Sequence, residues 1–322
     1  MHPFFSELFT KARRVKATIV LAEAEDERVV KAAHRIERLG LAKLILIGRP
    51  AKIAALAKKS GSPIESMVIN PRDYETNFAS ELYSLRKKKG MKKAQADKLA
   101  LDKHYFGAFL VRKGIADGMV SGNLSPTADT LRAALHVVGT LNKSRAYSYF
   151  LMLPRKETKP VFFADCGLNI DPDEKLLATI GAGTAQEAKR YGIRPRVAFL
   201  SYSTKGSAGG ASAEKSRKAA VLAKRKLRGV PVDGELQFDA AFVPAIGKHK
   251  APNSPLKGQA NVFVFPDLAA GNIAYKIAER VGGWHAIGPI VAGLRGPIND
   301  LSRGCSADDI VAAVAITALQ SR

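Results

Sequence analysis

Short apolar runs alternate with amphipathic stretches along the first 140 residues of the chain. ATIVLA at 17–22 and AKLILIG at 42–48 have the length and composition of buried strands, and residues 26–40 between them repeat apolar side chains at helical spacing. The same patterns predict further strands at 66–70 and 117–122 and further helices at 51–59, 74–115 and 128–138. Strands that alternate with helices form a parallel sheet with helices on both faces. We therefore expect an α/β protein.

A second alternating series begins near residue 146. It predicts strands at 146–153, 161–166, 196–202 and 260–265 and helices at 173–190, 213–228 and 268–281, with a break at 154–160. Because 322 residues exceed the usual size of one hydrophobic core, we expect two domains. We place one at 1–145 with 289–322 and the other at 146–288. The last helix returns to the first domain in this division, since a cleft between domains is a common place for a ligand site.

The last motif, GPINDLSRGCSADDI at 296–310, leads directly into an apolar helix. Ser306 has the character of an N-cap, and Asp309 three residues later completes a capping box. The first amides of such a helix have no partner within it and favour negative charge. The motif also gathers an amide, a hydroxyl, a guanidinium, a thiol and a carboxylate on Asn299, Ser302, Arg303, Cys305 and Asp309. These groups suit a site that binds an anion and moves a proton, although they could also do no more than cap the helix.

The charge of the chain favours anionic ligands. Its 51 Lys and Arg against 29 Asp and Glu leave a formal net charge of +22. Such a field attracts nucleic acid, membrane phosphates or small phosphorylated substrates alike. No zinc finger, RNA-recognition signature or basic run with interleaved aromatic residues appears, so we expect no specific nucleic-acid partner. The apolar runs are too short to cross a bilayer, so we expect no association with a membrane.

Cysteine and histidine usage limits the chemistry further. Cys166 and Cys305 are the only cysteines, too few for a disulfide framework, and they fit a reducing cytoplasm, where we expect the protein to act. The 6 histidines include no pair at metal-ligand spacing, so we predict no metal site. Neither cysteine has a base beside it in the sequence, which argues against covalent catalysis.

Two turns that follow predicted strands carry groups suited to phosphate. Residues 119–135 place Ser121 and Thr127 between a strand and a helix, where ligands of open α/β sheets gather. Residues 201–210 follow the strand at 196–202 and contain Ser203, Thr204 and Lys205 among glycines. Both turns remain open to a plainer interpretation, because the first could be an ordinary strand-to-helix connection and the second a mobile linker.

Several ungapped motifs resemble the phosphate acetyltransferases, also called phosphotransacetylases. They are AEAEDERVVKAA (22–33), ELYSLRKKKGM (81–91), MVSGNLSPTADTLRAAL (119–135), SYSTKGSA (201–208), DGELQFDAAFVP (233–244), the stretch 250–283, and IGPIVAGLRGPINDLSRGCSADD (287–309). The motifs occur in order along nearly the whole chain. From them the chain is identified as a member of that family.

The resemblance implies a two-domain, three-layer α/β/α fold like that of the isocitrate and isopropylmalate dehydrogenases, with the active site in the cleft between the domains. It also implies a homodimer. The implied reaction is the reversible transfer of an acetyl group between acetyl phosphate and coenzyme A, with CoA as a substrate and no tightly bound cofactor. The small-molecule partners are then acetyl phosphate, CoA and phosphate.

Matching motifs also imply roles for single residues. The catalytic base of the family falls on Asp309, its transition-state arginine on Arg303, and the neighbouring serine on Ser302. Arg86 and Arg132 match arginines associated with the phosphates of the substrate and of CoA. The remaining candidates for substrate contacts are Ser121, Thr127, Ser203, Thr204, Lys205, Asn299 and Cys305, of which Cys305 matches a cysteine that is not a nucleophile.

Elementary chemistry is consistent with these roles. A thiol with a pKa of roughly 8.5 is mostly protonated at neutral pH, so a carboxylate that takes its proton makes it a better nucleophile. A guanidinium can bind the developing negative charge through two parallel hydrogen bonds, which an ammonium cannot. Two alternatives stay open: a phosphate butyryltransferase with a longer acyl pocket, and a non-catalytic module of the same fold that binds polyanions or regulates another protein.

Overall fold

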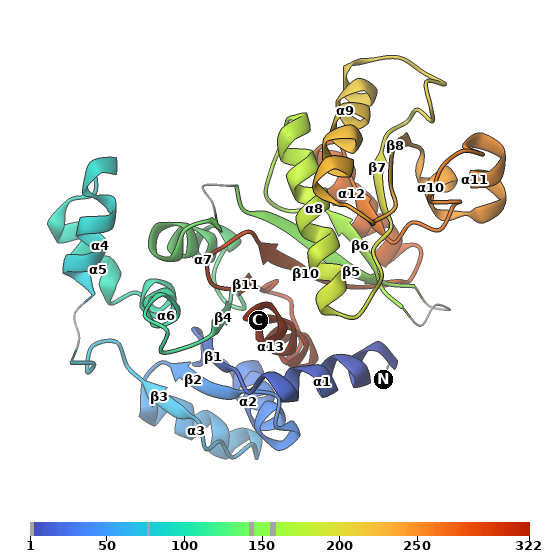
Figure 1. Cartoon of the computed structure of the whole chain (residues 1–322). Coiled ribbons are helices and arrows are strands. Elements are labelled where there is room, and N and C mark those ends of the chain that lie inside the picture. The colour runs from blue at the N-terminus through green and yellow to red at the C-terminus, as the bar shows by residue number, and fades with distance from the viewer. Residues whose placement is uncertain (1–2, 76–77, 142–144, 155–158) are drawn as a thin grey trace. The chain divides into compact units, whose positions relative to one another are not determined.

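The computed structural model describes residues 3–75, 78–141, 145–154 and 159–322. It divides the chain into two units, residues 1–144 with 293–322 and residues 145–292 (Figure 1). Of the predicted break at 154–160, residues 155–158 lie outside the described residues. In the described part of the chain, no helix is long and apolar enough to cross a membrane.

The first unit contains a five-stranded parallel sheet. The strands are β1 (Thr18–Leu21), β2 (Lys43–Ile47), β3 (Met67–Ile69), β4 (Gly118–Ser121) and β11 (Ile298–Asp300), and their order in the sheet is β11-β4-β1-β2-β3. Each neighbouring pair is parallel. The predicted parallel sheet of the first half is therefore confirmed, and β11 joins its edge from the far end of the chain.

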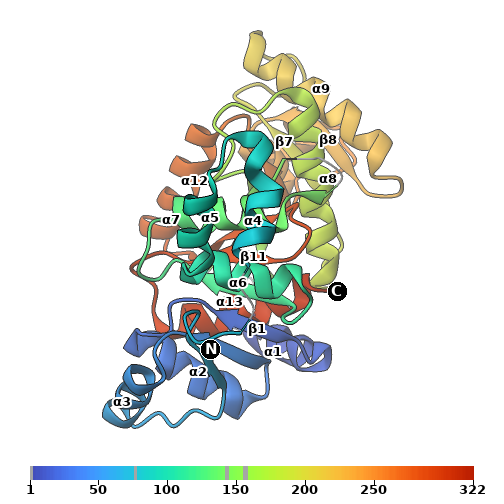
Figure 2. The same cartoon turned by 90° about the vertical axis from the view of Figure 1, so that its left-hand side faces the viewer.

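Helices cover both faces of this sheet. They are α1 (Pro3–Val15), α2 (Glu27–Leu39), α3 (Pro50–Ser60), α4 (Ala79–Arg86), η1 (Lys87–Lys89), α5 (Lys93–Ala100), α6 (Lys103–Arg112), α7 (Thr127–Ala133), η2 (Ala134–Val138) and α13 (Ala307–Gln320). Figures 1 and 2 show α2 and α3 on one side of the strands and α6 on the other. The apolar helix α13 packs on β1 and β4 beside α1 and α2. Its burial explains why residues 310–319 are almost entirely apolar.

The second unit contains a six-stranded sheet with the order β10-β5-β6-β9-β7-β8. The strands are β5 (Tyr147–Leu153), β6 (Val161–Ala164), β7 (Val197–Leu200), β8 (Val232–Leu236), β9 (Val262–Val264) and β10 (His285–Ala292). Its helices are α8 (Glu174–Arg190), α9 (Ala211–Lys226), α10 (Phe238–Phe242), α11 (Pro244–Lys250) and α12 (Leu268–Arg280). The core is aromatic and includes Phe150, Phe163 and Phe263.

The alternating pattern suggested that the second sheet would be parallel throughout. The structure differs from this prediction. β5 runs antiparallel to both β6 and β10, whereas the remaining pairs are parallel. For β5 and β6 the reason is the length of their connection, because residues 154–160 are too few for the crossover that parallel neighbours need. The observed fold is an α/β protein with two mainly parallel sheets.

Candidate active site

Three loops meet at the carboxyl edge of the first sheet. They follow β1 at 22–26, β4 at 122–126 and β11 at 301–306, and these strands are adjacent in the order β11-β4-β1. From β1 the chain proceeds through α2 to β2 on one side, whereas β4 lies on the other side of β1. Ligand sites of open α/β sheets form where the strand order reverses in this way. The loops therefore meet where the topology favours a site.

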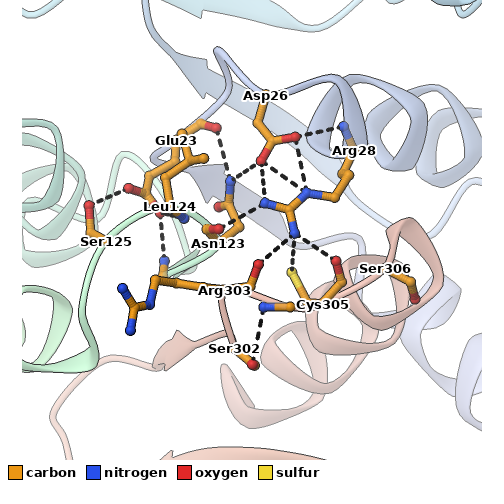
Figure 3. Close-up of polar contacts among 12 residues, drawn as sticks. Glu23, Asp26, Arg28, Asn123, Leu124, Ser125, Ser302, Arg303, Cys305 and Ser306 are labelled. Atoms are coloured by element: carbon orange, nitrogen blue, oxygen red, sulfur yellow. Dashed lines mark hydrogen bonds and ion pairs between the residues drawn. The ribbon is translucent and has the colours of Figure 1, made fainter.

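Arg28 on α2 holds the three loops together. Its Nη1 donates to the carbonyl oxygens of Arg303 at 2.8 Å and Cys305 at 2.9 Å. Its Nη2 donates to the carbonyl oxygen of Asn123 at 2.8 Å and to Oδ2 of Asp26 at 2.7 Å. Figure 3 shows the guanidinium between these four residues. One side chain thus fixes the backbone of the final loop against the other two loops.

Asp26 is the carboxylate partner of this guanidinium. It caps α2 by accepting from the amide of Arg28 at 2.8 Å, and it also accepts from Nδ2 of Asn123 at 3.0 Å. Burial alone would raise the pKa of Asp26, but the hydrogen bonds from Arg28 outweigh burial and lower it. The bond to Asp26 in turn raises the pKa of Arg28. The pair is therefore ionised across the physiological range.

Glu23 shapes the loop after β4. Its side chain is buried and accepts from the amides of Gly122 at 3.0 Å and Leu124 at 2.9 Å. It also accepts from Oγ of Ser125 at 2.6 Å and pairs with Nζ of Lys103 at 2.7 Å. Burial acts to raise the pKa of Glu23, but its hydrogen bonds hold that pKa well below its usual value. A buried, ionised carboxylate thus organises the turn that the sequence had suggested for phosphate.

His104 at the start of α6 lies between two carboxylates. Its Nδ1 is 3.3 Å from Asp102 and its Nε2 is 3.6 Å from Glu23, so the second contact is an ion pair rather than a hydrogen bond. Burial alone would lower the pKa of His104, but the two carboxylates raise it to about 9. His104 is consequently a cation at neutral pH and offsets the charge of Glu23.

The final loop exposes the side chains of Ser302 and Arg303. Oγ of Ser302 accepts from the amide of Gly304 at 3.3 Å. Ser306 and Asp309 form the predicted capping box: Oδ2 of Asp309 accepts from the amide and the hydroxyl of Ser306, each at 2.8 Å, and Oγ of Ser306 accepts from the amide of Asp309 at 3.2 Å. Asp309 is therefore held at the first turn of α13, on the same short segment as the exposed arginine.

Cys305 lies in the same loop but is buried. Its Sγ is 3.9 Å from Nη1 of Arg28. Burial raises the pKa of the Cys305 thiol to about 11, although Arg28 acts in the opposite direction. A thiol with such a pKa is protonated at neutral pH and is a poor nucleophile. The environment of Cys305 agrees with a packing role.

Arg86 and Arg132 both lower the pKa of one histidine in the first unit, His136, which contacts Tyr105. Oη of Tyr105 and Nδ1 of His136 are 2.9 Å apart. Burial and then the charges of Arg86 and Arg132 lower the pKa of His136 to about 4. Arg132 on α7 also pairs with Asp129 at 2.9 Å. The structure therefore brings both predicted arginines close to a neutral histidine, which the sequence analysis had not singled out.

Of three other predicted site residues of this unit, Ser121 and Asn299 are buried, whereas Thr127 at the start of α7 is exposed. Ser121 is fully buried at the end of β4, and Oγ1 of Thr127 donates to Oδ2 of Asp300 at 2.5 Å. Asn299 is fully buried, and its Nδ2 donates to Thr317 at 2.8 Å and to Gln320 at 2.7 Å. This placement fastens α13 to β11 and does not set Asn299 among the exposed groups of the final loop.

Ser203, Thr204 and Lys205 belong to the second unit and have partners there. Nζ of Lys205 donates to Oδ1 of Asp233 at 2.6 Å. Oγ of Ser203 accepts from the amide of Ala208 at 3.1 Å, and Oγ1 of Thr204 accepts from the amide of Gln237 at 3.0 Å. These contacts order the loop on the end of β8.

A pocket of about 630 Å³ opens beside Glu23 and Leu124, at the carboxyl ends of β1, β2 and β3. Its basic lining residues are Arg49, Lys52, Arg72 and Lys103. Among the residues that the structure describes, no group of three or more His, Cys, Asp or Glu could hold a metal ion. The site thus offers exposed cations, a carboxylate and ordered amides.

The residues that order the site were missed as site residues in the sequence analysis. Glu23, Asp26 and Arg28 come directly after the strand at 17–22, in a polar run that was recognised only as a family motif. Their position after a buried strand was the available signal. Asp300 gave no such signal, because it lies within a strand that the hydrophobic pattern does not show.

Comparisons with known proteins show the family of the chain. The family model for phosphate acetyl/butaryl transferase matches residues 3–318. The phosphate acetyltransferase of Bacillus subtilis (strain 168) is 44% identical over 323 aligned positions, which cover 100% of this chain and 100% of the relative. The phosphate acetyltransferase of Acetivibrio thermocellus is 44% identical over 328 positions, which cover 99% of this chain and 98% of the relative.

A solved structure supports the fold as well. The phosphotransacetylase from Streptococcus pyogenes superposes with a TM-score of 0.93 at 45% sequence identity, covering 99% of this chain and 98% of that chain. The resemblance found in the sequence motifs is thereby confirmed, as is the α/β fold class. From the family model, the relatives and the fold together, the chain belongs to the phosphate acetyl/butyryl transferase family.

Proposed function

We propose that this protein is a phosphate acetyltransferase that moves an acetyl group reversibly between acetyl phosphate and CoA. The observation that carries the proposal is the final loop, in which an exposed Arg303 and the capping carboxylate of Asp309 lie on one segment whose backbone is fixed by Arg28. Relatives of the same length that are named phosphate acetyltransferases, at 44% identity, support the acetyl group as the one transferred.

The proposed reaction is a direct displacement. The sulfur of CoA forms a bond to the acetyl carbon, the bond from that carbon to the phosphate oxygen breaks, and phosphate leaves. Asp309 takes the thiol proton during the attack. Both hydrogen bonds from Ser306 go to Oδ2 of Asp309, so Oδ1 is the oxygen that would accept the proton. The capping bonds would then keep the base oriented in both protonation states.

Arg303 would stabilise the charge that develops on the carbonyl oxygen and on the leaving phosphate. Its backbone carbonyl is held by Arg28, while its side chain is exposed. A fixed backbone places the guanidinium in advance, and preorganised donors of this kind contribute strongly to acyl transfer. Ser302 beside it offers a hydroxyl to the same phosphate.

Arg86 and Arg132 would bind phosphate groups of CoA or acetyl phosphate. Their shared effect on His136 indicates that both cations act at one place in the first unit. A neutral His136 adds no charge of its own and could donate a hydrogen bond from Nε2 if Nδ1 accepts from Tyr105. In this proposal CoA is a substrate and no bound cofactor takes part.

The direct test uses purified protein, acetyl phosphate and CoA. We expect a rise in ultraviolet absorbance as the thioester forms, and the reverse reaction on addition of phosphate to acetyl-CoA. Butyryl phosphate in place of acetyl phosphate tests the acyl pocket, with the acetyl compound expected to react faster. Faster transfer of butyrate would make the protein a phosphate butyryltransferase. Salt-sensitive retention of nucleic acid without acyl transfer would favour a polyanion-binding module instead.

The homodimer is also a proposal. Helix α12 of the second unit exposes Ile273, Ile277 and Val281, each more than half accessible. Their spacing of four residues puts them on one side of the helix, and such apolar stripes mark protein interfaces. We expect a dimeric mass in light scattering of the native protein and a monomeric mass for Ile277→Glu. A native monomer would contradict the assembly and leave the proposed chemistry untouched.

A further inference from the structure

Two buried polar residues lie side by side at the carboxyl edge of the first sheet. Asp300 on β11 and Ser121 on β4 are register partners, with exposed fractions of 3% and 0%. In the part of the chain that the structure describes, Oδ1 of Asp300 and Oγ of Ser121 have no hydrogen-bond partner. Burying such groups is unfavourable, so they are rare unless they have a function.

Asp300 packs directly against the turn after β4. Gly122 has a φ of +94°, and a methyl group there would lie 2.1 Å from Oδ1 of Asp300 and 2.8 Å from the amide of Leu301. That amide donates to the carbonyl oxygen of Ser121 at 2.7 Å. The carboxyl group is therefore enclosed between the start of the final loop and the turn that Glu23 organises.

A hydrogen bond links the Asp300 side chain to α7. Oγ1 of Thr127, the first residue of that helix, donates to Oδ2 of Asp300 at 2.5 Å. Arg132 lies further along the same helix, and the residue after Asp300 begins the loop that carries Ser302 and Arg303. The bond between Thr127 and Asp300 thus joins the element with one proposed substrate arginine to the loop with the other.

The surroundings of Asp300 carry both charges and hydroxyls. Burial raises the pKa of Asp300 to about 6, the charge of Glu23 acts in the same direction, and the hydroxyls of Thr127 and Thr130 oppose it. The groups that act on its pKa from the packed elements are Glu23 after β1, His104 on α6, and Thr127 and Thr130 on α7, and Ser121 on β4 is its register partner. Asp300 is therefore ionised at neutral pH and takes up a proton in mildly acidic solution.

We propose that Asp300 is a positioning residue for acyl transfer, which holds α7 and the final loop in register through Thr127 and does so best as a carboxylate. This inference rests on the proposed function for its consequences in catalysis. Protonation removes the charge that strengthens the bond from Thr127, since hydrogen bonds to ionised acceptors are the stronger ones. In acid, Arg132 and Arg303 are then held less firmly relative to each other, although the charge of neither arginine changes.

The kinetic test compares Asp300→Asn, Thr127→Val and Thr127→Ser with the wild type from pH 5 to pH 8. Hydrogen bonds to charged groups justify an expected loss of roughly tenfold in kcat/KM at neutral pH for the first two variants. Thr127→Ser keeps the hydroxyl and should stay near the wild type. The kcat/KM of the wild type should fall as the pH decreases through about 6, and the kcat/KM of Asp300→Asn should not show this fall. The double variant Asp300→Asn with Thr127→Val should be no worse than either single variant, because both remove one link.

Asp308→Asn is the matched control, because it removes a carboxylate that is exposed on the same segment. It should show the same fall in kcat/KM as the wild type. An Asp300→Asn variant that shows this fall, or losses that multiply in the double variant, would overturn the proposal.

A second readout does not depend on activity. Amide hydrogen exchange in residues 127–133, corrected for the intrinsic effect of pH, should speed up in Asp300→Asn and Thr127→Val and, in the wild type, as the pH falls below about 6. Unchanged exchange would refute the link even in an inactive protein. Faster exchange in a wild type without acyl transfer would refute the proposed function while the link between Asp300 and α7 stands.

Discussion

The loop after β11 in the first unit and the loop after β7 in the second both follow a parallel strand, and both carry hydroxyl side chains and a cation. In the second unit the cation already has a partner within the protein, because Nζ of Lys205 donates to buried Asp233 at 2.6 Å. In the first unit the backbone of Arg303 is held by Arg28 at 2.8 Å. Its own side chain forms no salt bridge with the residues that the structure describes, and it is exposed.

The difference shows how a side chain becomes available to a ligand. A loop needs partners for its backbone and its polar groups if it is to have one conformation. In the first unit Arg28 binds the backbone of the loop from another element, and Ser302 and Asp309 accept from amides beside them. The guanidinium of Arg303 takes no part in these contacts and stays exposed. In the second unit the side chains of the loop are themselves the hydrogen-bond partners. The loop is therefore ordered, but these side chains are less available to a ligand.

The largest effect is expected for Asp309→Asn. Asparagine keeps an oxygen that can accept from Ser306, so α13 keeps its cap, but the amide cannot take the thiol proton. Loss of a general base lowers turnover by roughly a thousandfold. The measurement is thioester formation together with the melting temperature, which should change little. Turnover close to that of the wild type would exclude Asp309 as the base.

Arg303→Lys tests the comparison most directly. The charge remains, but the two parallel hydrogen bonds to the developing oxyanion are lost, and loss of one preorganised donor costs roughly a hundredfold in kcat. Lys205→Arg is the matched exchange of cations in the other loop, and we expect a far smaller change from it. Equal effects on kcat would mean that the two loops do not differ in function.

Much of the fold followed from hydrophobic patterning, because a buried parallel strand is an apolar run and a covering helix shows an apolar stripe. Three strands were missed: β8 and β11 are polar, whereas β10 is mainly apolar but is interrupted by Gly288 and Pro289. β11 buries Asn299 and Asp300, whose partners Thr317 and Thr127 are distant in the sequence. β8 was missed in the same way, because Asp233 and Glu235 are buried in it.

The site was predicted only where its chemistry is local. The capping box of Ser306 and Asp309 joins residues three positions apart and could be recognised from the sequence alone. The contacts of Arg28 with Asn123 and Cys305 join residues 95 and 277 positions apart, and no spacing rule connects such residues. Patterns therefore predicted the loop that carries the proposed chemistry but not the residue that holds this loop in place.

Stability in alkali should distinguish the two units. The pKa of His104 is raised to about 9 in the folded protein, above the ordinary value of 6.5. Its contribution is complete below pH 6.5 and is lost as the pH rises through 9, and the raised pKa corresponds to about 3 kcal/mol. His104→Gln should therefore destabilise the first unit at pH 6 but hardly at pH 10.

Hydrogen exchange in α6 measures this loss in the first unit. The single tryptophan, Trp284, is partly buried against the core of the second unit and reports on that unit by its fluorescence. Burial acts to raise the pKa of Asp233 there, but its hydrogen bonds and the charge of Lys205 together lower it, so this carboxylate contributes stability that is lost in acid rather than in alkali. If His104→Gln lost the same amount of stability at pH 6 and at pH 10, His104 would not act through its charge.

The smallest effect concerns the loop of the second unit. Lys205→Met removes the nearest cation from buried Asp233, while Lys224 at 3.5 Å remains. A buried charge that loses one hydrogen bond costs about 2 kcal/mol, so the Trp284 unfolding transition should shift to lower denaturant. Lys215→Met is the control, because its partner Asp171 is exposed and such pairs contribute little. If Lys205→Met instead left the transition unchanged and reduced kcat as strongly as Arg303→Lys, the ion pair with Asp233 would be incidental, and both loops would serve the reaction.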